Sequence, residues 1–132
     1  MPIPTPPFPR PPRDENLLVV ATYNIHRAIG ADGLADPGRV AAVLREIDAD
    51  VVALQEVGAS EAAGTDALLE RLADATGTVA TRGFTLADAQ GDYGNVLLTR
   101  REPDRVERLD LTIEGNEPRG AIVAVSYTHL TL

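Results

Sequence analysis

The chain has 132 residues, the length of one ordinary domain, and it is long enough to bury a substantial hydrophobic core. It contains no cysteine, which excludes disulfide bonds and thiolate metal sites, and its two histidines are His26 and His129. Twelve arginines and no lysine stand against 20 acidic residues, and the formal charge of −8 is opposite to the basic footprint of a nucleic-acid-binding domain.

The first fifteen residues are rich in proline. Seven of the first twelve residues (MPIPTPPFPRPP) are proline, which removes backbone donors and favours extended conformations. We expect residues 1–15 to form a disordered leader. The segment lacks the apolar run of a signal peptide or a membrane span, so we expect a cytoplasmic protein without a transmembrane segment.

The first regular elements predicted along the chain are a strand and a helix. Residues 17–23 (LLVVATY) form a short apolar run with β-branched residues, which is typical of a strand buried on both faces. After a glycine-containing loop, Asp36 can cap a helix that has Pro37 at its first position. The apolar face of this helix, at helical spacing, consists of Val40, Val43, Leu44 and Ile47.

The next elements complete a strand–helix–strand unit. Residues 51–57 (VVALQEV) predict a second buried strand, which runs parallel to the first if the two pair in one sheet. A second helix is predicted to begin at Thr65 and to stop at Gly77. Four short runs then predict antiparallel strands: TVATRGFTL, GNVLLTR, VERLDLTI and GAIVAVSY. This order predicts an α/β fold in which a mixed β-sheet is backed by helices.

Polar residues stand where the two predicted parallel strands end. Asn24 ends the first strand, and Gln55 and Glu56 end the second. The carboxyl ends of parallel strands share one sheet edge, where open α/β sheets bind ligands. An amide and a carboxylate there suit Mg²⁺, which prefers hard oxygen ligands. From spacing alone a simpler interpretation stays open, with Asn24 capping the next turn and His26 as a loop residue.

Four motifs in this order resemble the endonuclease/exonuclease/phosphatase superfamily of deoxyribonuclease-like metallophosphoesterases. They are VATYNIH, DADVVALQEV, GDYGNVLLTR and EPRGAIVA, within residues 17–124. The resemblance implies that residues 16–124 form the N-terminal half of a four-layer α/β/β/α sandwich that hydrolyses phosphoester bonds with Mg²⁺ or Mn²⁺. It implies that Glu56 binds the metal, that Asn24 is an active-site asparagine contributing to the metal site, and that Arg119 faces the substrate phosphate.

The chain also departs from the family pattern. The second half of family members carries an Asp-x-Asn pair, a later metal-site Asp and a terminal Asp-His pair, and none of these is present. We therefore expect a fragment that is inactive by itself, because the attacking water lacks its base.

His129 matches a Thr-His-Leu of the family and is a candidate catalytic residue. However, only eight residues separate it from Gly120, too few for the strands the family inserts there, and VSYTHLTL resembles translated adaptor sequence. We treat residues 125–132 as a tail foreign to the domain.

Two functions remain open from the sequence. The first is a phosphodiesterase or phosphatase acting on a small molecule, a lipid headgroup or a nucleic acid, without an obligate protein partner. The acidic balance favours small phosphoesters over long DNA, because binding to DNA phosphates uses many arginines and lysines. The alternative is a non-catalytic α/β binding or interaction module, which has no reason to hold Mg²⁺ near Glu56.

Overall fold

A computed structural model describes residues 14, 16–59, 64–88 and 91–127. Nearly all of the predicted leader and the end of the predicted tail, including His129, lie outside these residues. Within the described part of the chain, no helix is long and apolar enough to cross a membrane.

The described residues form a mixed sheet, two helices and a separate pair of strands. In chain order the elements are β1 (Val20–Asn24), a 3₁₀ turn (His26–Ala28), α1 (Pro37–Ile47), β2 (Val51–Val57), α2 (Gly64–Thr76), β3 (Val79–Asp88), β4 (Gly91–Thr99), β5 (Arg105–Asp110) and β6 (Gly120–Val125). The four-stranded sheet has the order β1-β2-β4-β3, with β1 and β2 parallel and the other pairs antiparallel. Strands β5 and β6 form an antiparallel pair. The prediction of an α/β fold with a mixed sheet is confirmed.

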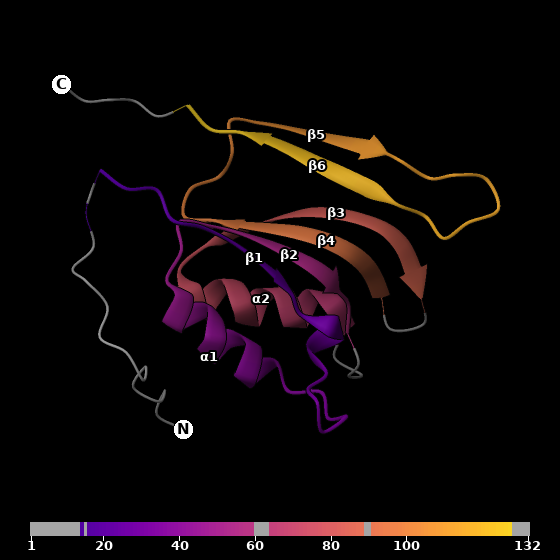
Figure 1. The fold of residues 1–132 in the computed structure, drawn as a ribbon, viewed down its shortest axis with the longest axis horizontal. Coiled ribbons are helices and arrows are strands. Elements are labelled where there is room, and N and C mark those ends of the chain that lie inside the picture. Colours follow the sequence, from indigo (N-terminus) through magenta and orange to yellow (C-terminus); the bar gives the residue numbers. More distant parts are fainter. Residues whose placement is uncertain (1–13, 15, 60–63, 89–90, 128–132) are drawn as a thin grey trace.

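The helices and the β5–β6 pair lie on opposite faces of the sheet. Figure 1 shows α1 and α2 together below the sheet and the β5–β6 pair above it. Strand β6 contacts β3 and β4. The core fills the layer between helices and sheet, where Leu54, Leu72 and Leu98 are at most 1% exposed. The polar residues that end β2, Gln55 and Glu56, line a hollow on the other face, beside the β5–β6 pair.

Helix α1 begins, and helix α2 ends, where their sequence signals predict. The Asp36 side chain accepts a hydrogen bond from the backbone N–H of Arg39 at 3.2 Å and caps α1, and Pro37 occupies the first position. Gly77 follows the last residue of α2 with a φ of +64°, a left-handed conformation that glycine adopts without steric cost. The predicted apolar face of α1 departs from expectation at one position, since Val43 is 38% exposed.

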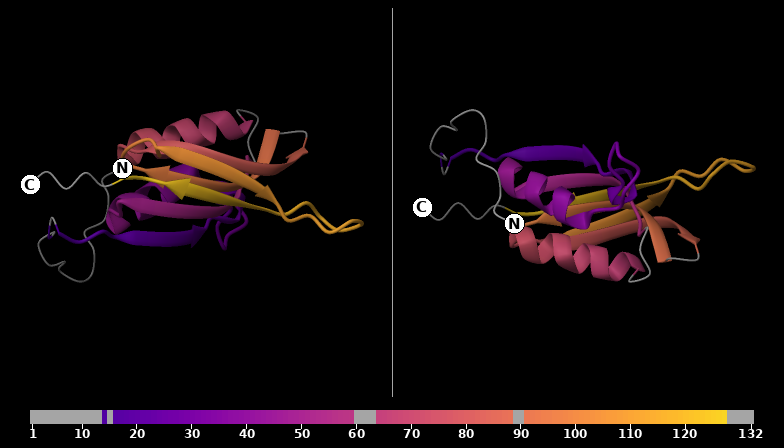
Figure 2. Two further views of the ribbon diagram at one scale, coloured as in Figure 1. Left: turned by 90° about the horizontal axis from the view of Figure 1, so that it is seen from above. Right: turned by 90° about the horizontal axis from the view of Figure 1, so that it is seen from below.

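The prediction that residues 17–23 form a strand buried on both faces is wrong. Strand β1 begins at Val20 and alternates between exposed and half-buried side chains, and Leu17 and Leu18 precede it at 64% and 69% exposure. The reason is its position at the edge of the sheet, because the β5–β6 pair packs over β3 and β4. Seen from above, β1 lies to one side of that pair (Figure 2).

Thr65 joins α2 to β4 through a buried hydroxyl. Its side chain donates to the carbonyl of Asp92 at 2.7 Å and accepts from the N–H of Ala59 at 3.3 Å, and the residue is only 3% exposed. Removing the hydroxyl would take one hydrogen bond from each of these two backbone groups.

We therefore expect Thr65→Val, which keeps the side-chain shape, to lower the free energy of unfolding by about 1–3 kcal/mol. Urea denaturation measures the change. Thr65→Ser keeps the hydroxyl and serves as the control, with the smaller loss expected for one methyl group. Equal losses in the two variants would show that packing, not hydrogen bonding, is the contribution of Thr65.

Candidate active site

A β-bulge at the end of β2 directs Glu56 away from the core. Leu54 pairs with Val96 and Val57 pairs with Gly94, so β2 carries one more residue than β4 over this stretch. The extra residue returns Val57 to the buried face, where it is 0% exposed. Glu56 itself has a left-handed φ of +54°, which costs a residue other than glycine roughly 1 kcal/mol. The bulge therefore accepts strain and keeps a carboxylate out of the helix-covered core.

Glu56 and Arg119 line one hollow on the face away from the helices. The hollow has a volume of about 240 Å³. Its walls come from β2, β3, β4 and the segment that leads into β6, and they comprise Gln55, Glu56, Thr85, Tyr93, Gly94, Asn95, Glu117, Pro118, Arg119 and Gly120. The carboxylate and the guanidinium predicted from the sequence thus share one concave surface, although they lie more than sixty positions apart in the chain.

His26 links Asn24 to Glu56, because it contacts both residues. The Asn24 Oδ1 atom accepts a hydrogen bond from the backbone N–H of His26 at 3.0 Å. The His26 Nδ1 atom lies 3.6 Å from Glu56 Oε2, and these two side chains are 73% and 40% exposed. Asn24 is opposite Gln55 in the parallel register, but it does not line the hollow of Glu56. It supports the turn that presents the imidazole to the carboxylate.

That turn is strained. His26, Arg27 and Ala28 have φ values of +49°, +54° and +62°, and consecutive left-handed residues other than glycine are rare. The turn is held by hydrogen bonds from the N–H of Ala28 to the carbonyl of Ile25 and from the N–H of Ile29 to the carbonyl of His26. Such strain concentrates at functional sites. Here it places two side chains, His26 and Arg27, beside the end of β2.

The Tyr93 ring contacts Arg27 and lines the hollow together with Glu56 and Arg119. The Arg27 guanidinium carbon lies 4.2 Å from the centre of the Tyr93 ring, a cation–π contact. Burial raises the pKa of Tyr93, and the negative charge of Glu56 raises it further, while Arg27 and Arg119 act in the opposite direction. Gly58 allows this packing, because an added Cβ would lie 2.8 Å from the Tyr93 ring. The pKa of Tyr93 therefore depends on its burial and on the charges of Glu56, Arg27 and Arg119.

Two side chains, those of Asn95 and Thr112, hold the backbone at Arg119 and Gly120. The amide of Asn95 on β4 donates to the carbonyl of Gly120 at 3.2 Å, and the N–H of Arg119 donates to the hydroxyl of Thr112 at 3.2 Å. At Gly120 an added Cβ would lie 2.7 Å from the methyl group of Thr85, so β6 approaches β3 closely here. The guanidinium pairs with Glu117 at 2.9 Å, with side chains 65% and 48% exposed. An ion pair so exposed is weak, so an incoming anion can displace Glu117 from the guanidinium.

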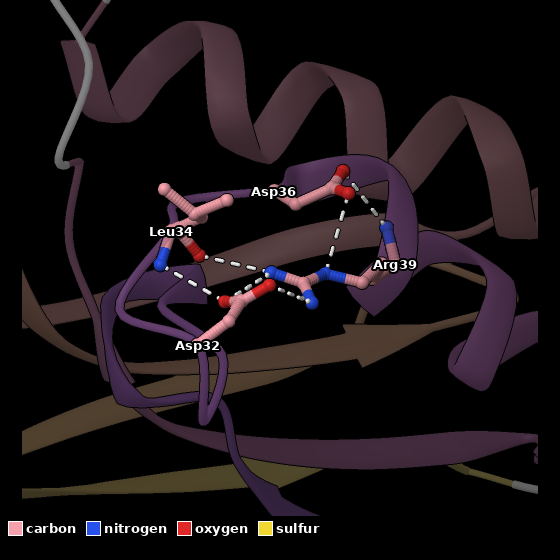
Figure 3. A network of polar contacts seen from close by, with 4 residues as sticks. All are labelled: Asp32, Leu34, Asp36 and Arg39. Carbon is pink, nitrogen blue, oxygen red and sulfur yellow. Dashed lines mark hydrogen bonds and ion pairs between the residues drawn. The ribbon is translucent and has the colours of Figure 1, made fainter.

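The loop between Asn24 and α1 is closed by Arg39. Its guanidinium donates to Asp32 at 2.9 and 3.0 Å and to the carbonyl of Leu34 at 3.0 Å, and its Nε lies 3.2 Å from Asp36 (Figure 3). Gly30 leaves room for this group, because an added Cβ would lie 2.7 Å from the Arg39 Nη2 atom. The Arg39 network thus secures the loop that follows the strained turn.

The sequence profile of the Endonuclease/Exonuclease/phosphatase family matches residues 21–132, which is most of the chain. The chain belongs to the endonuclease/exonuclease/phosphatase family. Among solved structures it is similar to an endonuclease/exonuclease/phosphatase from Beutenbergia cavernae DSM 12333, with 29% identity and a TM-score of 0.65 over 81% of this chain and 33% of that one. A family protein from Leptotrichia buccalis C-1013-b shares the fold at 18% identity and a TM-score of 0.56, over 80% of this chain and 47% of that one. No curated protein matches the chain.

The family resemblance inferred from the motifs is confirmed, and so is the fold that it implied. This endonuclease/exonuclease/phosphatase chain spans one third to about one half of the length of the two solved chains. Its mixed sheet, two helices and additional strand pair correspond to part of the family's sandwich.

The donor set around Glu56 suits one side of a magnesium shell. Glu56 contributes a half-exposed carboxylate, whereas the Asn24 amide oxygen accepts from the N–H of His26 and does not line the hollow. Mg²⁺ is commonly held by one or two carboxylates and completes its shell with water and substrate phosphate. Among the residues that the structure describes, no group of three His, Cys, Asp or Glu side chains converges. The fit is therefore that of a metal ion held at one carboxylate.

Sequence reasoning missed Tyr93, Asn95 and Glu117 as lining residues. A signal was present for the first two, since β4 alternates and places Tyr93 and Asn95 on the face opposite to buried Gly94 and Val96. Glu117 gave no such signal, because it lies in an irregular segment between strands. His129 lies outside the described residues, so its predicted catalytic role stays a prediction.

We expect Glu56→Gln to lower the pKa of Tyr93, since it removes the negative charge that disfavours the phenolate. The pKa should stay above 10.0, because burial is the larger cause and is unchanged. Arg119→Gln should shift it upward. Phenolate absorbance as a function of pH, with Tyr93→Phe to identify the titrating group, measures both changes. Shifts of the same sign in the two variants would contradict the assignment of both charges to this hollow.

The Arg39 network should make loop stability depend on pH. Hydrogen bonding from Arg39 lowers the pKa of Asp32 from its ordinary value of 3.8. The ionised carboxylate therefore stabilises the fold above that value, and the contribution is lost as the pH falls through the lowered pKa. Asp32→Asn should destabilise the chain at neutral pH and differ less from wild type in acid, as measured by urea denaturation. Asp74→Asn removes an exposed charge on α2 and is the control.

Proposed function

We propose that this chain carries the metal-binding and phosphate-binding part of a Mg²⁺-dependent phosphoesterase, with Mn²⁺ as an alternative ion. The observation that carries the proposal is the single hollow lined by Glu56 and Arg119. A carboxylate beside a guanidinium offers one group to a cation and the other to an anion. This combination suits a metal ion with a phosphate bound to it.

The roles of the two residues follow from their chemistry. Glu56 holds the ion, and the bulge keeps its carboxylate accessible to it. Arg119 binds a phosphate through parallel hydrogen bonds, for which its planar guanidinium is suited. The phosphate replaces Glu117, whose ion pair with Arg119 is largely exposed. The bound metal supplies polarisation of the phosphate and a lower pKa for a coordinated water.

Asn24 and His26 support Glu56 from the side of β1. Asn24 holds the N–H of His26, and the imidazole lies beside the carboxylate. Asn24 is the candidate second metal ligand, because its amide oxygen has one further lone pair. His26 orients the Glu56 carboxylate, a role that sequence reasoning did not assign to it.

The proposed substrate class is a small phosphoester, a lipid headgroup or a short nucleic acid. The formal charge of −8 disfavours long DNA, whose binding gains from many phosphate contacts. The solved structures to which the chain is similar are two to three times as long as the matched part. We therefore propose that the 132-residue chain by itself turns over substrate poorly, so that binding, and not turnover, tests the roles of these residues.

Mn²⁺ added to the chain should broaden the NMR signals of residues around Glu56, because Mn²⁺ is paramagnetic and occupies magnesium sites. Mg²⁺ should reverse the broadening by competition. Glu56→Gln should abolish it, whereas Glu70→Gln, a matched change on the exposed side of α2, should leave it unchanged. Arg119→Lys should keep the metal signal and weaken binding of inorganic phosphate. Broadening that is absent from wild type, or that survives in Glu56→Gln, would favour the non-catalytic α/β module instead.

A further inference from the structure

A second hollow adjoins the one that contains Glu56. It has a volume of about 440 Å³ and lies between β3 and the β5–β6 pair. The two hollows share Thr85, Pro118 and Gly120 as walls. We call it the hairpin hollow. The proposed phosphate chemistry uses none of its remaining residues.

Both apolar and polar side chains line the hairpin hollow, and we call the polar ones its rim. Phe84, Leu109, Pro118 and Ala121 supply the apolar surface, and Thr85, Arg108, Asp110 and Thr112 supply the polar groups. The rim is held in place by internal hydrogen bonds. The N–H of Thr112 donates to Asp110 at 2.9 Å, and Nε of Arg108 donates to the carbonyl of Arg82 at 2.5 Å.

The hairpin hollow is joined mechanically to Arg119. The Thr112 hydroxyl accepts from the N–H of Arg119 at 3.2 Å and lies 3.4 Å from its carbonyl oxygen. The N–H of Leu111 donates to the same carbonyl at 2.9 Å. A ligand that contacts Thr112 therefore orders the backbone that carries the phosphate-binding guanidinium.

The polar groups at the rim favour an occupant with both hydrogen-bond donors and acceptors. Asp110 accepts hydrogen bonds and Arg108 donates them, and their opposite charges offset one another, so a neutral group of this kind can bond to each. The walls of Phe84, Leu109 and Pro118 favour a ligand with an apolar face. Volumes of roughly 300–1,000 Å³ are usual for small-molecule pockets, so the space suits a single ring system.

We propose that the hairpin hollow binds the non-reacting part of the substrate, a neutral ring that carries both hydrogen-bond donors and acceptors. Sugars and heterocyclic bases share this chemistry. The assignment rests on the proposed function only for the position of the phosphate, which lies beside Glu56 and Arg119 when the ring occupies the hairpin hollow.

The test is an NMR titration of the 132-residue chain, in the presence of Mg²⁺, with five probes. These are inorganic phosphate, ribose 5-phosphate, adenosine 5′-monophosphate, ribose and adenosine. We expect the two ring-bearing phosphates to bind at least about tenfold more tightly than inorganic phosphate. They should also shift the amide signals of Thr85, Leu109 and Ala121. A gain already complete with ribose 5-phosphate identifies the sugar as the bound ring, and a further gain with the nucleotide identifies the base.

Two matched variants locate the gain. Leu109→Trp places a large side chain in the hairpin hollow, and it should reduce the affinity for ring-bearing phosphates to that for inorganic phosphate. Ile113→Trp introduces the same side chain four residues away, at a residue outside the lining, and should preserve the tenfold gain. Leu109 and Ile113 are 46% and 71% exposed, so neither change disturbs a buried core.

The outcomes separate this subsite from the proposed function. Equal affinity for inorganic phosphate and ring-bearing phosphates, or a gain that survives in Leu109→Trp, would overturn the subsite and leave the phosphoesterase proposal standing. Shifts of the hairpin amides by free adenosine or ribose, with no phosphate probe perturbing Glu56, would support the subsite and count against the phosphoesterase. No shift at these amides with any ring-bearing probe would also overturn the subsite.

Discussion

One extra residue in β2, which forms a β-bulge, keeps the Glu56 carboxylate out of the helix-covered core. In a regular strand Glu56 would follow Val52 and Leu54 onto the helix-covered face, where a carboxylate without a partner is costly. The bulge opposite Val96 and Gly94 returns Val57 to that face instead. The strain of a left-handed Glu56 is small beside the cost of burying its charge. The rest of the site is arranged around this exception.

Close packing between the two layers brings Arg119 into the hollow that Glu56 lines. The β5–β6 pair can approach the sheet because Gly83 and Gly120 have no side chain; an added Cβ at Gly83 would lie 2.4 Å from Ile122. This approach places Arg119 at the end of β2, and Asn95 secures the adjoining carbonyl. Two charges distant in sequence thus line one hollow, and the hairpin hollow opens beside it.

The left-handed turn of His26, Arg27 and Ala28 also brings polar side chains to the end of β2, from the side of β1. His26, Arg27 and Ala28 are strained, and the hydrogen bond from His26 to Asn24 and the closing contacts of Arg39 hold the loop around them. The turn delivers an imidazole to Glu56 and a guanidinium to the ring of Tyr93. Backbone strain at the turn and at the bulge therefore converges on the same carboxylate.

The sequence by itself determined the α/β class, the two helices, the N-cap of α1, the glycine stop of α2, the bounds of β2 and the family, because these depend on local periodicity, capping chemistry and contiguous motifs. It also identified Glu56 and Arg119 as candidate site residues, while Tyr93 and Asn95 were identified only as part of a strand. Only the tertiary structure decided that β1 is an edge strand, that Glu56 occupies a bulge and that Arg119 shares its hollow. Those facts depend on which strands pair and how closely the layers approach, and both are set by contacts between residues far apart in the chain.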